Sequence, residues 1–169
     1  REDSEIVIKH FPMGKKDRVL KALEAYEFIE SKLREGKNVA FLTIGDPYVY
    51  STYSHMLKHM RDDGFQVETI PGITSFCAAA SLVDRTLVVG NENLVVMPAT
   101  KVKEITDEKF IVVMKVYKHE EEVLNTLEEK GFDYIYASRV GREGQIVLTD
   151  REEILKVRDY MSLIIASRS

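Results

Sequence analysis

The sequence has 169 residues, 44% of them hydrophobic, which is enough to bury one substantial core or two small ones. Lys and Arg number 24 against 28 Asp and Glu, a net charge of −4, so no overall positive field favours nucleic acid or an anionic membrane. No apolar run is long enough to span a bilayer, and the first residues lack a signal-peptide pattern. The single cysteine, Cys77, excludes an internal disulfide, and together these features predict a cytoplasmic protein.

The first half of the chain alternates short apolar runs with segments of helical period, which is typical of parallel strands joined by crossover helices. The helices are expected to end at Gly36 and near Gly64, because glycine readily stops a helix. The sequence therefore predicts an α/β domain over residues 1–89 with a mainly parallel sheet. Its expected elements, in chain order, are a strand at 5–9, a helix at 17–35, a strand at 38–44, a helix around 53–60, a strand at 66–70 and a short alanine-rich helix at 75–82.

Beyond residue 84 the strands come with fewer helices between them, which predicts a second, mixed-sheet domain over residues 90–169. The clearest helix there is expected at 119–130, with apolar residues at helical spacing. The turn Gly141-Arg142-Glu143-Gly144 is expected to join two antiparallel strands. The expected strands are 94–97, 110–117, 133–138, 145–148 and 160–166.

Asp46 lies where the strand at 38–44 ends, between Gly45 and Pro47. Two interpretations remain open for it. Asp46 is the N-cap of the following helix, since aspartate is a favoured cap and Pro47 suits the first helical position. Alternatively, its carboxylate binds ribose hydroxyls or a cationic ligand, because ligands of open α/β sheets gather beyond the carboxyl ends of strands.

Thr74 and Ser75 repeat this arrangement after the next strand, in the run Pro-Gly-Ile-Thr-Ser. Either residue is a candidate N-cap for the alanine-rich helix. Together with Asp46 they are also candidates to line one crevice. The chain has no G-x-G-x-x-G and no G-x-x-x-x-G-K-[ST], so the common phosphate-binding loops are not indicated.

Other candidate chemistry has less support. His55 and His59 stand one helical turn apart, but no third ligand is evident and they lie away from the apolar stripe, so a solvated face is favoured and no metal site is predicted. Cys77 has no neighbouring base in the sequence and is interpreted as a packing residue.

Five segments of the sequence together resemble one known family. The stretches VAFLTIGDPYVYSTY and VETIPGITSFCAAA resemble the tetrapyrrole methylases, S-adenosylmethionine-dependent enzymes that methylate the macrocycle in corrin and sirohaem synthesis. FPMGKKD, GNENLVVMP and YMSLIIASR resemble the branch that methylates C20 of precorrin-2 or its cobalt form. Diphthine synthases carry an Ala-Thr-Thr-His-like run after Gly-Asp-Pro, where this chain has Tyr-Ser-Thr-Tyr, so a macrocycle substrate is favoured.

The resemblance implies a two-domain tetrapyrrole methylase-like fold, a homodimer, and S-adenosylmethionine bound between the domains. It also implies in-line attack of the acceptor carbon on the donor methyl group, with no general base assigned. Met114 has a second interpretation as core filler. The donor contacts that the resemblance implies are Gly45, Asp46, Val49, Thr74, Ser75, Met114, Val140, Ser162 and Leu163.

The acceptor that the resemblance implies carries acetate and propionate groups, so an enzyme of negative net charge needs local cations to hold it. Tyr50, Arg139 and Arg142 are the predicted acceptor contacts, with Lys115 and Lys118 as further nearby cations. The family begins with a strand and a Gly-rich loop that this sequence lacks, so it resembles an N-terminally truncated member. Two alternatives stay open: another tetrapyrrole methylase, or a donor- or corrinoid-binding fragment without turnover.

Overall fold

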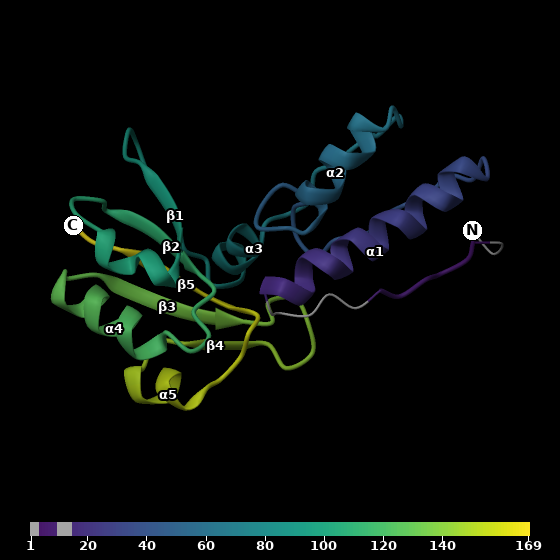
Figure 1. Ribbon diagram of the computed structural model, residues 1–169. Helices are drawn as coiled ribbons and strands as arrows, with labels where there is room; N and C mark the ends of the chain where they lie inside the picture. Colours follow the sequence, from purple (N-terminus) through teal and green to yellow (C-terminus); the bar gives the residue numbers. More distant parts are fainter. Residues whose placement is uncertain (1–3, 10–14) are drawn as a thin grey trace. The chain divides into compact units, whose positions relative to one another are not determined.

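The computed structural model describes residues 4–9 and 15–169, with the backbone alone for residues 15–19 (Figure 1). The chain divides into two compact units, Arg1–Ile73 and Thr74–Ser169. The domain boundary expected at residues 89 and 90 therefore differs from this division. The reason is α3 (Ser75–Leu82), which packs on the sheet of the second unit rather than on the first.

The first unit is built on two helices that lie side by side, α1 (Lys15–Arg34) and α2 (Tyr53–Asp62) (Figure 1). The apolar stripe predicted for α2 is confirmed, since Tyr53, Met56, Leu57 and Met60 are all buried. Tyr26 and Ile29 of α1 pack against Met56 and Met60. This helix pair forms the core of the unit.

The segments expected as strands at 5–9, 38–44 and 66–70 belong to no helix or strand, so the mainly parallel sheet predicted for this part of the chain is not formed by the described residues of the first unit. One side of them packs on the helices through Phe41 and Val67, while Leu42 on the other side is 88% exposed. Residues of the segments 4–9 and 36–44 line a cavity of about 1180 Å³. The apolar run at 38–44 predicted a buried strand, whereas no strand is formed there.

The second unit contains a mixed five-stranded sheet, as predicted, in the order β1-β2-β5-β3-β4. β1 and β2 are parallel, whereas β5 runs antiparallel to both β2 and β3. β3 and β4 form the antiparallel pair expected on either side of the turn at 141–144. The strands are β1 (Leu94–Pro98), β2 (Phe110–Met114), β3 (Asp133–Ser138), β4 (Ile146–Leu148) and β5 (Ser162–Ser167).

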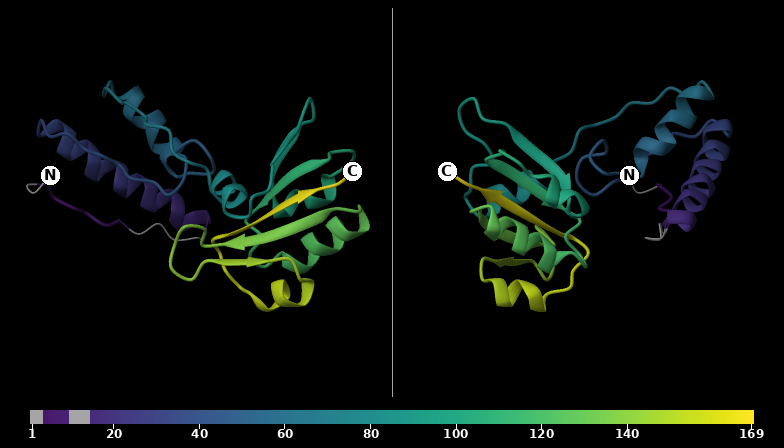
Figure 2. Two further views of the ribbon diagram at one scale, coloured as in Figure 1. Left: turned by 180° about the vertical axis from the view of Figure 1, so that it is seen from behind. Right: turned by 60° about the vertical axis from the view of Figure 1, so that its left-hand side comes forward.

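The two faces of this sheet carry different layers (Figure 2). α4 (Glu120–Glu129) and α5 (Arg151–Lys156) cover one face, with the short 3₁₀ helix η1 (Ala99–Glu104). α3 covers the other face, where Ala79 and Ala80 lie against Leu163 and Ile165. Their small side chains allow the close packing on the sheet that the alanine-rich sequence predicts.

Two differences from the predicted elements have local causes. β2 ends at Met114 rather than at residue 117, because Lys115 adopts a left-handed conformation with φ 59° and turns the chain. α5 was not expected, although Asp150 and Glu153 have the spacing of a capping box. The Asp150 carboxylate accepts the Glu153 N–H at 3.0 Å.

No helix in the described part of the chain is long and apolar enough to cross a membrane.

Tyr134 of β3 gives a titration test of this packing. Its hydroxyl donates to Glu128 Oε1 of α4 at 2.6 Å. Burial first, and then the Glu128 carboxylate, raise the pKa of Tyr134 from 10.0 to about 12. Folding raises the pKa of Tyr134, so its protonated hydroxyl contributes to the stability of the folded state below pH 10. This contribution is lost as the pH rises towards 12.

We expect Glu128→Gln to lower the pKa of Tyr134 towards 10.0, because it removes the charge that opposes tyrosinate. Ultraviolet titration of the variant, with Tyr134→Phe used to assign the signal, measures this. Glu129→Gln changes an exposed neighbour on the same helix and serves as the control. An equal shift in both variants would contradict the contact.

Candidate functional site

In the first unit, Asp46 ties two loops together through both of its carboxylate oxygens. Oδ1 accepts the Tyr48 N–H at 2.8 Å, within its own loop. Oδ2 accepts the Gly72 N–H at 3.0 Å, from a loop 26 residues further along the chain. An ionised carboxylate has about four acceptor positions, so two remain for a ligand.

The interpretation of Asp46 as a helix N-cap is wrong. α2 begins at Tyr53, and the residue at its N-cap position is Thr52. Pro47 is buried in the turn that precedes the helix rather than in its first turn. Asp46 therefore joins two loops through its hydrogen bonds instead of capping a helix. Its interpretation as a ligand contact stays a prediction.

Gly72 is a functional candidate that the sequence reasoning passed over. A Cβ at Gly72 would lie 2.4 Å from the carbonyl oxygen of Gly45 and 3.1 Å from its carbonyl carbon. Contacts below 3.0 Å with backbone atoms cannot be relieved by moving a side chain. The Pro-Gly dipeptide signalled only a turn, whereas glycine is needed here for the close approach of two loops.

The remaining predicted residues of the first unit lie on the same loop. Gly45 has φ 77°, and the Val49 N–H donates to the Asp46 carbonyl at 3.2 Å. Tyr50 has φ 52°, is about half exposed, and lines the cavity of this unit. His55 is exposed, as is His59 one turn later. Among the described side chains, no cluster of His, Cys, Asp and Glu has the arrangement of a metal site.

In the second unit, Thr74 caps α3. Its backbone is extended, with φ −64° and ψ 148°, and its hydroxyl accepts the Cys77 N–H at 3.4 Å. The capping interpretation is confirmed for Thr74, while Ser75 is the first residue of the helix and is exposed. Cys77 is also exposed, so its interpretation as a packing residue is wrong.

We expect Thr74→Ala to lower the free energy of unfolding by about 1 kcal/mol, the usual effect of losing a hydroxyl cap. Thr74→Ser should retain most of the stability, because serine caps at least as well. Urea unfolding of the two variants beside the parent measures this. Equal stability of Thr74→Ala and the parent would contradict a capping role.

Three of the predicted donor contacts meet on the α3 face of the sheet. Met114 of β2 and Leu163 of β5 are register partners. Val140, just after β3, packs partly buried against the same cluster, as do Met114 and Phe76. The sequence did not show that residues from three separate segments share one apolar cluster. We call this set, Phe76, Met114, Val140 and Leu163, the α3-face cluster.

Ser162, predicted beside Leu163, lies on the opposite face of β5. Its side chain is 6% exposed, and its hydroxyl donates to the Asp159 carbonyl at 2.7 Å. Successive residues of a strand point to opposite faces, so Ser162 and Leu163 cannot both present side chains to one ligand. The Ser162 side chain therefore stabilises the loop that leads into β5.

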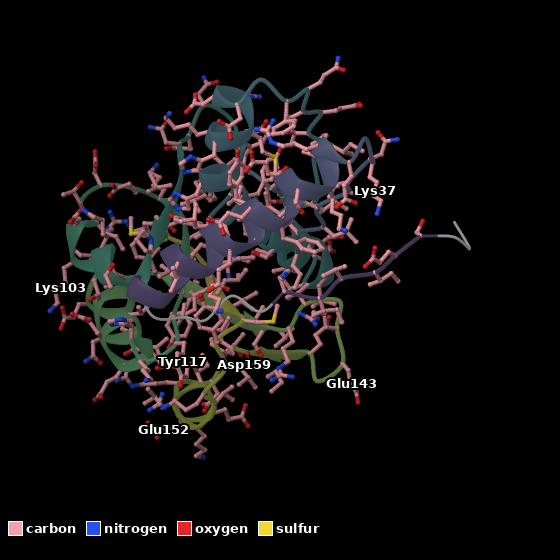
Figure 3. The ribbon with its side chains drawn as sticks, turned by 45° about the vertical axis from the view of Figure 1, so that its right-hand side comes forward. Lys37, Lys103, Tyr117, Glu143, Glu152 and Asp159 are labelled. Carbon is pink, nitrogen blue, oxygen red and sulfur yellow. The ribbon has the colours of Figure 1, made fainter. Side chains whose placement is uncertain are left out.

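Asp159 is the centre of that loop and was missed by the sequence reasoning. Asp159 is labelled in Figure 3. Its carboxylate pairs with Arg139 and accepts the Met161 N–H at 2.8 Å. Burial alone would raise the pKa of Asp159, but the Arg139 guanidinium and the Met161 N–H outweigh it, and the pKa lies below its usual value. An Asp three residues before a strand, able to accept the N–H two positions further on, is a recognisable signal for this kind of turn.

β2 and β3 both run antiparallel to β5, so they end at the same edge of the sheet. Each is followed by a non-glycine residue in the left-handed conformation, Lys115 with φ 59° and Arg139 with φ 50°. Lys118, in the loop after β2, is also left-handed with φ 68°. Sequence positions thus place predicted cations at this edge, beside the α3-face cluster.

Comparison with known proteins identifies the family. The profile of the Tetrapyrrole (Corrin/Porphyrin) Methylases matches residues 1–155. The probable cobalt-precorrin-2 C(20)-methyltransferase of Methanocaldococcus jannaschii is 35% identical over 166 residues, covering 94% of this chain and 70% of that relative. The precorrin-2 C(20)-methyltransferase of a Sinorhizobium species is 30% identical over 147 residues, covering 82% of this chain and 59% of the relative.

Solved structures have the same fold. A cobalt precorrin-4 methyltransferase matches with a TM-score of 0.71 at 16% identity, covering 86% of this chain and 70% of the other. A uroporphyrin-III C-methyltransferase from Thermus thermophilus, solved with S-adenosyl homocysteine, matches with a TM-score of 0.69 at 17% identity, covering 86% and 73%. The predicted α/β fold class is confirmed, and the chain belongs to the tetrapyrrole methylase family.

Proposed function

We propose that the protein transfers a methyl group from S-adenosylmethionine to C20 of precorrin-2 or its cobalt form, in cobalamin biosynthesis. The observation that carries this proposal is the 35% identity with the M. jannaschii relative over 94% of the chain. A second relative named for C20 methylation supports the position. The likeness to methyltransferases of other specificity supports the fold alone, since those structures are below 20% identical.

Each unit, taken by itself, carries residues that we propose as donor contacts. In the first unit, the two free acceptor positions of Asp46 suit ribose hydroxyls, and the Gly45 loop is braced by the Gly72 contact. In the second unit, the α3-face cluster offers apolar contact for the adenine and methionine portions. The proposed contacts are Gly45, Asp46, Val49, Thr74, Ser75, Met114, Val140, Leu163 and the backbone at Ser162.

S-adenosylmethionine supplies an electrophilic methyl group when it is bound. The chain's own residues have to align the two reactants and exclude water. In a reaction without a covalent intermediate, these two effects are the main ways in which a protein lowers the activation barrier. We assign no general acid or base. Tyr50, Arg139 and Arg142 stay predicted contacts of the acceptor, and no resident metal is proposed.

The test is incubation with S-adenosylmethionine and precorrin-2, metal-free or cobalt-bearing, followed by mass and NMR analysis of the product. One added methyl group at C20 supports the proposal. Methylation at another position supports a different tetrapyrrole methylase, and no methylation with retained binding of both ligands supports a binding module. The cobalt state of the better acceptor decides between the two C20 activities.

A homodimer and a cytoplasmic location are proposed with this function. The dimer rests on the family resemblance, and the location rests on the single cysteine, which fits a reducing compartment. Nucleic acid and membrane partners are not proposed. Sedimentation analysis at several protein concentrations tests the dimer.

A further inference from the structure

Arg139 and Arg142 lie on one loop but differ in their partners. Arg139 pairs through Nε with Asp159, and its side chain packs within 3.5 Å of where a Gly144 Cβ would be. Arg142 donates from Nη1 to the sulfur of Met161 at 3.2 Å. No carboxylate among the described side chains pairs with Arg142. Arg139 is thus held in an ion pair, whereas the guanidinium of Arg142 donates to a neutral sulfur.

The loop that carries Arg142 is braced along its length. The Arg142 N–H donates to the Arg139 carbonyl at 2.9 Å, and the Gln145 N–H donates to the Arg142 carbonyl at 3.1 Å. The Gln145 side chain accepts the Gly141 N–H at 2.7 Å. The Arg139–Asp159 pair anchors the start of the loop to the segment before β5. Arg142 is therefore held on a preorganised turn, which reduces the entropy lost on binding.

Arg142 also lies close to the proposed donor site in the chain. Val140, two residues earlier, packs in the α3-face cluster with Met114 and Leu163. A thioether is a weak hydrogen-bond acceptor, so a carboxylate readily replaces Met161 as the partner of the guanidinium. The guanidinium fork can then engage both oxygens of that carboxylate.

Resting on the proposed function, we propose that Arg142 binds a side-chain carboxylate of the tetrapyrrole acceptor, and that Arg139 positions the loop through Asp159 without contacting the acceptor. The pairing leaves one arginine of the loop for recognition and gives the other a structural role. Arg142 is then a determinant of affinity for the acceptor and not for the donor.

The experiment measures the Kd of precorrin-2 and of S-adenosylmethionine for the parent and three variants. Arg142→Gln is expected to raise the Kd for precorrin-2 about tenfold, the scale of one lost charge-assisted hydrogen bond at an exposed site. Arg142→Lys keeps the charge but loses the fork and should give a smaller increase. Lys156→Gln makes the same charge change as Arg142→Gln on α5, which covers the other face of the sheet, and should leave both constants unchanged.

A fully esterified precorrin-2 provides the second readout. The parent and Arg142→Gln should bind it equally, because no carboxylate remains for Arg142. A persisting difference would show contact with the ring instead and overturn the carboxylate assignment. An unchanged Kd for precorrin-2 in Arg142→Gln also overturns it.

The same titrations keep this inference separate from the proposed function. A parent protein that binds neither form of the acceptor overturns the proposed function and this assignment with it. If the parent binds the acceptor and Arg142→Gln binds it with the same Kd, this assignment alone is overturned. A fourth variant, Arg139→Gln, should melt at a lower temperature and, where its fold is retained, lose less acceptor affinity than Arg142→Gln; an equal or greater loss would overturn the positioning role of Arg139.

Discussion

Replacing Gly72 by alanine is expected to disrupt the contact between the two loops of the first unit and to weaken S-adenosylmethionine binding about 100-fold. The new Cβ would stand 2.4 Å from the Gly45 carbonyl oxygen, so the backbone of one loop must move. Overpacking of this kind typically costs about 1 to 3 kcal/mol. The Gly72 N–H would also be drawn from Asp46 Oδ2, which adds about 1.5 to 3 kcal/mol for a hydrogen bond to a charged group.

Gly64→Ala is the matched control for this change. Gly64 lies in the same unit, has φ 78°, and a Cβ there meets nothing within 4 Å. It should cost only the left-handed strain of about 1 kcal/mol and leave donor binding intact. Urea unfolding and calorimetry with S-adenosylmethionine compare the two variants. Equal results for both would show that the close approach of Gly72 to Gly45 has no part in the site.

The second large effect is expected for Asp46→Asn. Asparagine has one acceptor oxygen where aspartate has two, so it cannot receive both the Tyr48 and the Gly72 N–H groups. One N–H is then opposed by the amide NH₂. We expect a loss of about 1.5 to 3 kcal/mol in the free energy of unfolding, because a charge-assisted hydrogen bond is removed. Asp63→Asn, an exposed change of equal charge in the same unit, should be near neutral.

Donor binding by Asp46→Asn needs a second measurement, because loosened loops alone would weaken it. If Asp46 also accepts from the ribose, the parent should bind a 2′,3′-dideoxy donor more weakly than S-adenosylmethionine. Asp46→Asn should then discriminate less between the two donors, since the groups are coupled. Unchanged discrimination in the variant would limit Asp46 to holding the loops together.

Elements whose causes are local could be predicted from the residues alone. The buried stripe of α2 and the bounds of α3 and β3 follow from residue spacing and from caps and stops within a few positions. The alternation of the sheet faces also follows from a period of two. The Gly-Asp-Pro and Pro-Gly-Ile-Thr-Ser segments could be singled out in advance, because such loops follow the ends of extended segments.

The contacts between distant segments could not be predicted from the residues alone. The hydrogen bond from Gly72 to Asp46 spans 26 residues, and no local pattern reports which of several acceptors a distant N–H will reach. The division between Ile73 and Thr74 follows from α3 packing on β5, and the sequence of α3 alone does not say which surface it will cover. Asp159 likewise selected Arg139 rather than Arg142 through the distance between two loops. The spacing of residues determines on which face of a helix or strand a side chain lies. Its partners from distant segments depend on the path of the whole backbone.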